Sequence, residues 1–134
     1  MAAIQVFDAS KVTVILNNMA VTGFKKGTFV TANKDDDAVT VESNAQGEST
    51  WTINSSKLGT IQLTLNQTSP FCKVLNQLAN NHTFFPIWVN DPINKEKRGG
   101  TQAMVTKVAD ATYSDGNEGR QYTIKVGDFQ IINS

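Results

Sequence analysis

Hydrophobic and polar positions alternate with a period of two over much of the chain, and the clearest example lies just before its middle. In Thr60–Leu65, Ile61, Leu63 and Leu65 alternate with threonine and glutamine. A period of two places successive side chains on opposite faces of a β-strand. This segment therefore predicts a strand with one face on a core.

The period changes to that of a helix in the segment that follows. Its apolar residues are spaced i, i+3, i+4 and i+7, which places them on one helical face. Ser69 and Pro70 predict the start of the helix, and Asn80-Asn81 predicts a left-handed end. Because so short a helix is marginal alone, we expect it to pack on a sheet. The apolar face consists of Phe71, Val74, Leu75 and Leu78.

The rest of the chain predicts short strands separated by turns. Asn17-Asn18 indicates a turn with positive φ, Pro86 indicates a sheet edge or a bulge, and Gly127 indicates a kink. The expected strands besides Thr60–Leu65 are Lys11–Leu16, Met19–Phe24, Gly27–Ala32, Ala38–Ser43, Ser49–Ile53, Phe84–Val89, Thr101–Val108, Gln121–Val126 and Asp128–Ile132.

Two strands of this series predict an unusually extended hairpin, at about residues 38–53, with a glycine-containing loop. Segments Asn33–Asp37 and Asn90–Gly100 are expected to be polar loops. The strand spacing predicts a mainly β fold, an antiparallel β-sandwich or barrel of about nine strands. One flanking α-helix is expected at about residues 69–80.

The length and composition agree with one domain that has unusual surfaces. A chain of 134 residues predicts a single domain over residues 1–134. Charged residues make up 18% of it, which is below the usual quarter. Threonine, serine, asparagine and glutamine cover the polar strand faces instead. Because free monomers usually protect sheet edges with charge, this surface favours edges that pair with copies of the same chain. The net charge of zero gives no support to a basic nucleic-acid-binding surface.

Candidate catalytic and metal-binding groups are few. Cys72 is the only cysteine and lies within the expected helix, as a packing thiol would. A Ser–His–Asp triad would have to use His82, the only histidine, and carboxylate pairs of glycosidase type are not excluded. The acidic run Asp35–Asp37 lacks the spacing of a calcium loop and indicates a solvated tip. We therefore expect no catalytic, cofactor-binding or metal-binding residues.

No targeting segment is visible in the sequence. The first eight residues lack the basic and apolar regions of a signal peptide. No apolar run approaches the roughly 18 residues of a membrane span. We therefore expect a protein made in a cytoplasm, which stays there or leaves as part of a particle, with no membrane partner.

Several segments resemble the tail tube proteins of contractile-tailed bacteriophages. They are VTVILNNMAVTGF at residues 12–24, the DDD run, and the stretch from residue 39 to residue 75. The similarity covers nearly the whole chain and is most specific over Gly47–Leu78, where SSKLGTIQLTLNQTSP precedes the expected helix. Gly127-Asp128 fits the family's closing segment more loosely.

The resemblance implies a structural role. Members of this family form a β-sandwich or barrel with a helix at its side, and six copies make a ring. The rings stack into a hollow tube inside a contractile sheath, and strands of neighbouring subunits join into an inner barrel through which DNA passes. Contractile bacteriocins and type VI secretion systems use related tubes.

The resemblance also implies the partners and the location. The expected partners are copies of the chain itself, the tail sheath protein, and baseplate and tape-measure proteins. DNA would pass through the lumen without specific binding, which agrees with the lack of a basic stripe. The expected location is the virion tail tube, after synthesis in the cytoplasm of a bacterial host.

The extended hairpin is the expected lining of the lumen. Its polar positions would face the lumen and its apolar positions the core of the subunit, unless a register shift of one residue exchanges the two faces. The residues expected at the lumen are Thr40, Glu42, Thr50 and Thr52. The residues expected in the core are Val39, Val41, Trp51 and Ile53.

Contacts between rings are expected at Asn33–Asp37, at the hairpin tip Asn44–Glu48 and at Ala2–Asp8, with the acidic run meeting the basic segment Lys95–Arg98. That basic segment contains Glu96 and lacks aromatic residues for stacking bases, so a solvated loop is favoured over a phosphate site. The named candidates between rings are Asp35, Asp36, Asp37, Gln46, Glu48, Lys95, Lys97 and Arg98. The candidates for contact with the sheath or a neighbour are Lys73, Asn76 and Gln77.

Three other functions are open to the same sequence. A baseplate or tail-terminator ring shares the fold without polymerising, and a secretion tube subunit would carry effectors instead of DNA. A small ligand-binding β-sandwich would use Trp51, Trp88 and Tyr113 as stacking residues. Electron microscopy of the purified protein separates tubes from single rings, and a monomer with sugar-dependent tryptophan quenching would favour the ligand-binding function.

Overall fold

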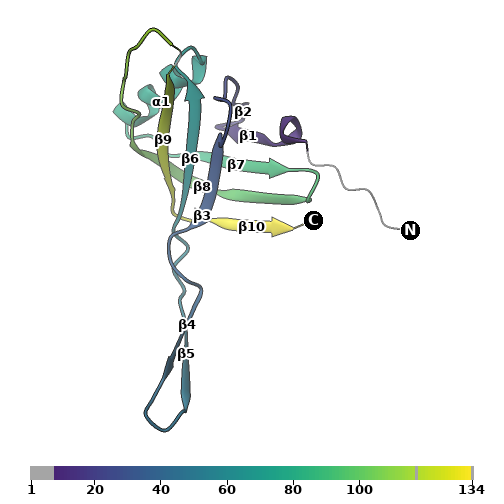
Figure 1. Ribbon diagram of the computed structural model, residues 1–134, viewed down its shortest axis with the longest axis vertical. Helices are drawn as coiled ribbons and strands as arrows, with labels where there is room; N and C mark the ends of the chain where they lie inside the picture. Colours follow the sequence, from purple (N-terminus) through teal and green to yellow (C-terminus); the bar gives the residue numbers. More distant parts are fainter. Residues whose placement is uncertain (1–7, 117, 134) are drawn as a thin grey trace, which may run out of the picture.

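The computed structural model describes residues 8–116 and 118–133. These residues form ten strands and one α-helix, preceded by a short 3₁₀ turn, η1, at Ala9–Lys11 (Figure 1). The mainly β fold with one helix is therefore confirmed. The elements are β1 (Thr13–Leu16), β2 (Met19–Ala20), β3 (Val30–Lys34), β4 (Val39–Ser43), β5 (Ser49–Ile53), β6 (Gly59–Asn66), α1 (Pro70–Asn80), β7 (Phe85–Asp91), β8 (Glu96–Lys107), β9 (Gly119–Val126) and β10 (Gln130–Asn133).

Eight strands form one antiparallel sheet in the order β2-β1-β7-β8-β9-β6-β3, with β10 also paired to β8. The long strand β8 pairs with β10 along its first part and with β9 along its second part. The chain passes from β9 to β10 through Gly127 and Asp128, at the kink that the sequence predicts. There the Asp128 carboxylate accepts hydrogen bonds from the backbone N–H groups of Thr101 and Gln102, each at 3.0 Å.

The sheet curls around one hydrophobic core. Along β6 and β9, alternate residues are buried, because their period of two places every second side chain on the inner face. At the far end of the curl, the Arg98 guanidinium on β8 donates to the Ala32 carbonyl on β3 at 3.2 Å. The largest fully buried side chains are Val14, Leu16, Ile61, Leu63, Leu65, Leu75, Phe85, Ile87, Tyr122, Ile124 and Val126.

Helix α1 lies at one end of this curled sheet (Figure 1). Ser69 caps its first turn by accepting a hydrogen bond from the Phe71 N–H, and Pro70 is its first residue, as predicted. Leu75 and Cys72 are its most buried residues. The predicted left-handed end at Asn80-Asn81 is wrong, because Asn81 has φ −88° and the positive φ of 50° falls on His82.

The other turn and bulge signals have mixed outcomes. Asn17 and Asn18 have φ values of 49° and 66°, which confirms the predicted turn. The register of β7 against β8 shifts between Phe85 and Ile87, so Pro86 lies at a bulge, also as predicted. The expected loop Asn90–Gly100 is wrong in its extent, because β7 and β8 pair as far as Asp91 and Glu96 and only residues 92–95 form the turn between them.

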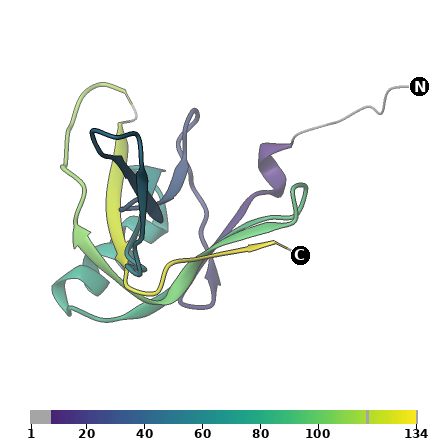
Figure 2. The ribbon, with the colours of Figure 1, turned by 90° about the horizontal axis from the view of Figure 1, so that it is seen from below.

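Strands β4 and β5 form a separate two-stranded sheet that extends well beyond the body of the molecule (Figure 1). Their register pairs Val39 with Ile53 and Ser43 with Ser49, which confirms the predicted hairpin. Seen from below, the hairpin lies in front of the β9 side of the sheet, while the β7–β8 end and β10 extend away from α1 (Figure 2). We refer to residues 39–53 as the projecting hairpin.

Candidate assembly surfaces

The projecting hairpin exposes one apolar face. All ten residues of β4 and β5 are exposed, and the register places Val39 opposite Ile53 and Val41 opposite Trp51. Their exposed fractions are 45%, 81%, 53% and 67% in that order. The expectation that these four residues lie in the core of the subunit is therefore wrong. Their common face follows from the period of two, but the hairpin extends past the sheet that would have covered it.

The opposite face of the hairpin is polar. Thr40 pairs with Thr52 and Glu42 pairs with Thr50. All four, the residues expected to line a lumen, are exposed on the side away from the apolar face. Their place at a lumen stays a prediction, since it depends on how copies of the chain assemble.

The hairpin tip is a compact polar turn. The Asn44 side-chain oxygen accepts hydrogen bonds from the backbone N–H groups of Gln46 and Glu48, at 3.0 and 2.9 Å. Gly47 within the turn has φ 85°. The side chains of Gln46 and Glu48, which were expected at ring contacts, are exposed at this far end.

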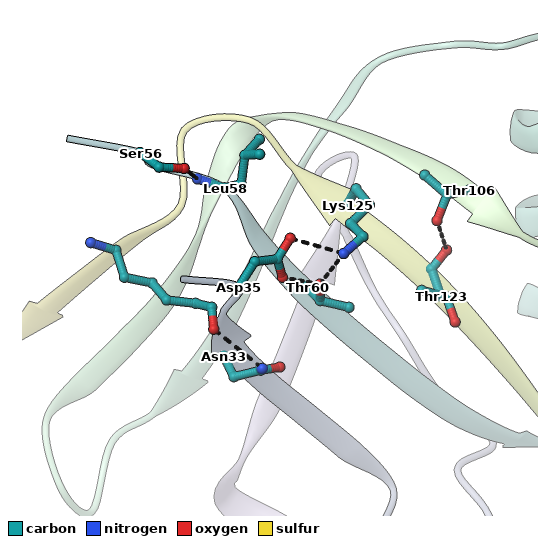
Figure 3. A network of polar contacts seen from close by, with 9 residues as sticks. Asn33, Asp35, Ser56, Leu58, Thr60, Thr106, Thr123 and Lys125 are labelled. Atoms are coloured by element: carbon teal, nitrogen blue, oxygen red, sulfur yellow. Dashed lines mark hydrogen bonds and ion pairs between the residues drawn. The ribbon is translucent and has the colours of Figure 1, made fainter. Parts of the chain in front are cut away.

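The base of the hairpin is held by a polar network that joins β6 and β9 to Asp35, the residue after β3 (Figure 3). Lys125 on β9 donates to the Asp35 carboxylate at 2.9 Å and to the Thr60 hydroxyl at 2.8 Å. The Thr60 hydroxyl in turn donates to Asp35. The hydrogen bond from Lys125, followed by that from Thr60, lowers the pKa of Asp35 below its ordinary value. Backbone bonds from Asp35 N to Leu58 O and from Asn54 N to Ala38 O close the same end.

This network changes the interpretation of the acidic run Asp35–Asp37. Asp35 is an ion-pair partner within the chain, whereas Asp36 and Asp37 are exposed beside it. Among the described residues, no group of three or more histidine, cysteine, aspartate or glutamate side chains is arranged to hold a metal ion. Asp36 and Asp37 therefore remain the more accessible candidates for a contact with another subunit.

A second polar face covers the outer side of β6 and β9, and it is not among the surfaces expected from the sequence. Gln62 on β6 accepts a hydrogen bond from the Gln121 side chain on β9 at 3.4 Å. Thr123 offers its carbonyl to Thr106 of β8 at 3.3 Å (Figure 3). The signal was available in the alternation of Thr60–Leu65, where every second residue carries a hydroxyl or an amide. We call the residues Thr60, Gln62, Thr64, Gln121 and Thr123 the polar sheet face.

The basic segment expected between rings is largely engaged within the chain. Lys97 and Arg98 lie on β8 rather than in a loop, and Lys95 in the turn has φ 55°. The Lys97 ammonium lies 4.6 Å from the centre of the Trp88 ring. The Arg98 guanidinium forms an ion pair with Glu96 at 2.7 Å.

The outer residues of α1 differ in their environment. Lys73 and Gln77 are exposed, as their proposed contact with a neighbour or sheath requires. Asn76 is half-buried, and its side-chain oxygen accepts a hydrogen bond from the Tyr122 hydroxyl at 3.1 Å. Burial, followed by the nearby Cys72, raises the pKa of Tyr122 to about 12.

The remaining expected sites are scattered or lie outside the described residues. Trp51, Trp88 and Tyr113 lie on β5, β7 and the segment after β8, and Lys97 covers Trp88. His82 is exposed just after α1. Of the expected ring contact at Ala2–Asp8, only Asp8 is described. In the described part of the chain, no helix has the length and apolar character needed to cross a membrane.

Solved structures with the same fold come from phage-like particles. One is a chain of the anti-feeding prophage cap that terminates the tube, with a TM-score of 0.67 and 16% identity over 100% of this chain and 95% of the other. A chain of the native gene transfer agent virion has a TM-score of 0.68 and 13% identity over 95% and 99%. A chain of the sheath/tube terminator of an extracellular contractile injection system, PVC, has a TM-score of 0.64 and 10% identity over 98% and 99%. At these identities the similarity establishes the fold.

Comparison of the sequence itself gave no match. No protein-family model matches this chain, and no curated protein matches it.

Proposed function

We propose that this chain is a non-catalytic structural subunit of a contractile injection system or a related phage-like particle, where copies of it associate around the particle axis. The observation that carries the proposal is the fold similarity over at least 95% of the chain to components of such particles. The projecting hairpin supports it, because an exposed apolar face of this kind is typical of an interaction site.

The first candidate role is a ring at the end of the tube or in the baseplate. It is favoured because the similar structures include a tube-terminating cap, a sheath/tube terminator and, with a TM-score of 0.54, a chain of the anti-feeding prophage baseplate. The partners in this role are the neighbouring tube, sheath or baseplate proteins. Residues 1–134 would act together as one domain of that ring.

The second candidate role is the repeating tube subunit, in a virion tail or in an effector-carrying tube. A chain of the PVC sheath-tube complex, with a TM-score of 0.63 and 9% identity, supports this role. Copies of the chain would then form stacked hexameric rings. These rings would contact the sheath on their outer side and the tape-measure protein and DNA on their inner side. The chain would be made in the bacterial cytoplasm before assembly.

In either role we propose that hydroxyl and amide groups line the axial channel. The candidates are the polar sheet face and the polar side of the projecting hairpin, which includes Thr40 and Thr52. These groups are neutral, and the ammonium of Lys125 beside Thr60 is paired with Asp35, so few cations would meet the phosphates of a passing nucleic acid and cargo would move without tight binding. This arrangement would also direct the apolar side of the hairpin toward another subunit.

Electron microscopy and sedimentation velocity of the purified protein test the proposal. Rings of uniform diameter support a terminator or baseplate ring, and long tubes of uniform width support the tube subunit. Co-purification with sheath protein would support the sheath as the partner on the outer side. A monomer at every concentration, with tryptophan fluorescence quenched by sugars, contradicts both roles and supports the small ligand-binding β-sandwich.

A further inference from the structure

An apolar groove lies beside the start of the chain's first strand. We call it the η1–β2 groove; it is open, has a volume of about 660 Å³ and lies between η1, β2 and the segment that leads to β3. The rings of Phe24 and Phe29 lie 5.0 Å apart, centre to centre, in its wall. Lys26 is exposed in the same lining. The apolar residues that the argument uses are Val12, Ala20, Val21, Phe24 and Phe29.

The projecting hairpin has an apolar face that the described residues of its own chain leave exposed. Trp51 and Ile53 are 67% and 81% exposed, and both lie on the face shared with Val39 and Val41. Removing such side chains from water is favourable. A groove with an apolar lining is a suitable partner for this face.

The charges of the two surfaces are complementary. Residues 35–53 contain no lysine or arginine. Of their five carboxylates, Asp35 is paired with Lys125 within the chain, which leaves Asp36 and Asp37 beside the base of the hairpin and Glu42 and Glu48 on it. Residues 8–29, which form the groove side, contain three lysines and one aspartate. Opposite net charges steer association and favour this pairing over contact between two hairpins or between two grooves.

The two surfaces lie at opposite ends of the molecule. Strand β3 runs from the segment that lines the groove, at Val30, to the base of the projecting hairpin, at Lys34. In Figure 1 the segment before β3 lies near the upper end and the hairpin forms the lower end. A hairpin therefore cannot reach the groove of its own chain, and the pairing requires a second copy.

We propose that the apolar face of the projecting hairpin docks in the η1–β2 groove of the next copy of this chain. The inference rests on the proposed self-association and names the two surfaces that carry it. Each copy offers one hairpin and one groove, so the contact is head-to-tail, and the rotation between copies decides whether a closed ring or a tube results. Docking covers Trp51 and leaves the polar side, with Thr40 and Thr52, facing away.

Two matched variants test the docking, each at an exposed position outside the core. Ile53→Glu places a carboxylate on the apolar face of the hairpin, and Ala20→Glu places one in the groove. Each variant alone is expected to need at least a tenfold higher protein concentration to assemble than the wild type. A 1:1 mixture is expected to form a two-chain complex and nothing longer, because it contains one intact hairpin and one intact groove per pair. Thr52→Glu, on the polar side, is the control and is expected to assemble.

Tryptophan fluorescence gives a second readout. In a Trp88→Phe background, Trp51 is the only tryptophan. Its emission is expected to shift to shorter wavelength when the protein assembles and to stay unshifted in the Ala20→Glu variant. Assemblies in which Trp51 keeps the emission of an exposed indole overturn the proposal.

The outcomes separate the docking from the proposed function. A wild-type protein that stays monomeric at every concentration rejects the proposed self-association and the docking with it. Wild-type assembly that persists in Ile53→Glu or in Ala20→Glu rejects the docking alone. In that case another occupant, such as the chain's own first seven residues or a different protein, covers the groove.

Discussion

The Nζ atom of Lys125 lies 2.9 Å from Oδ2 of Asp35, and this ion pair joins the base of the projecting hairpin to β9. The two residues are 90 positions apart in the sequence. Thr60, which pairs with Lys125 in the register of β6 and β9, completes the network. Polar contacts at its base therefore fix the direction of a hairpin whose ten strand residues are all exposed among the described part of the chain.

Loss of the Lys125 ammonium is expected to loosen the hairpin without unfolding the body. Because the ion pair is partly exposed to water, Lys125→Met should change the free energy of unfolding by less than about 1 kcal/mol. The amides of Asp35 and Asn54, which close the base, should exchange their hydrogens faster. Hydrogen exchange measures this, with Lys107→Met as the control on β8. Unchanged exchange at both amides would contradict the role of Lys125.

Acid is expected to weaken the fold through two carboxylates. The hydrogen bonds from Lys125 and then Thr60 lower the pKa of Asp35. For Asp128, partial burial opposes the shift, but the hydrogen bonds from Thr101 and Gln102 outweigh it and lower the pKa. A lowered pKa in the folded state gives stability that is present above the unfolded value of 3.8 and is lost as the pH falls through the folded value.

Urea unfolding at about pH 7 and about pH 3 measures this loss. The wild-type protein should lose stability over this range, and Asp128→Asn should lose less, because its amide does not titrate. Asp36→Asn is the control, since Asp36 is exposed beside the network. An equal loss in wild type and in Asp128→Asn would show that other groups control the acid response.

Gly99 is expected to be the least tolerant glycine for substitution. Its φ is 150°, and a Cβ atom there would overlap the Ile87 carbonyl oxygen of the neighbouring strand. Gly99→Ala should lower the free energy of unfolding by at least about 2 kcal/mol. Gly47→Ala, at φ 85° with no atom within 4 Å of the added Cβ, should cost about 1 kcal/mol. Thermal unfolding compares the two, and equal effects would contradict a steric cause.

The Tyr122 hydroxyl is expected to stabilise the packing of α1. It donates to the Asn76 side chain at 3.1 Å, so Tyr122→Phe should cost about 1 kcal/mol. Burial, followed by Cys72, raises the pKa of this group from 10.0 to about 12, so its contribution is present below the unfolded pKa and is lost as the pH rises through about 12. Phenolate absorbance during alkaline titration should show a late step that the variant lacks. If the late step persists in Tyr122→Phe, a group other than the Tyr122 hydroxyl causes it.

The Ser69 side chain is expected to stabilise both the start of α1 and a contact with a residue distant in the sequence. Its hydroxyl donates to the Thr22 carbonyl at 2.7 Å and accepts from the Phe71 N–H at 3.3 Å. Since Ser69 is buried, Ser69→Ala should lower the free energy of unfolding by about 1–2 kcal/mol. Ser55→Ala, at an exposed position, is the control and should have little effect. Chemical denaturation of both variants measures the difference.

Most strands and the helix could be predicted from local patterns. The alternation in Thr60–Leu65 predicts both the strand and its buried face, because a period of two has one geometric meaning in an extended chain. Ser69 and Pro70 predict the start of α1, because their preference for that place is a property of the helix end itself. The hairpin register follows from the same local chemistry.

The candidate surfaces were less predictable. Val41 and Trp51 share a face as their spacing predicts, yet both are exposed, because an apolar pattern shows which residues need a cover and not whether their own chain supplies it. The segment Asn90–Gly100 is rich in turn residues, yet all of it except residues 92–95 lies on strand, because β7 and β8 pair with each other up to Asp91 and Glu96. The turn propensity of a residue determines its local structure only weakly where a neighbouring strand offers hydrogen-bond partners.

By itself, the sequence determined the mainly β class, the hairpin, the helix start and the division of each strand into apolar and polar faces, because these depend on side-chain spacing within a few residues. Only the tertiary structure decided which faces are covered. The sheet curls over the inner face of β6 and β9, leaves the polar sheet face outside, and sends the hairpin past its edge. Those outcomes depend on contacts between residues as distant as Asp35 and Lys125, which no local pattern encodes.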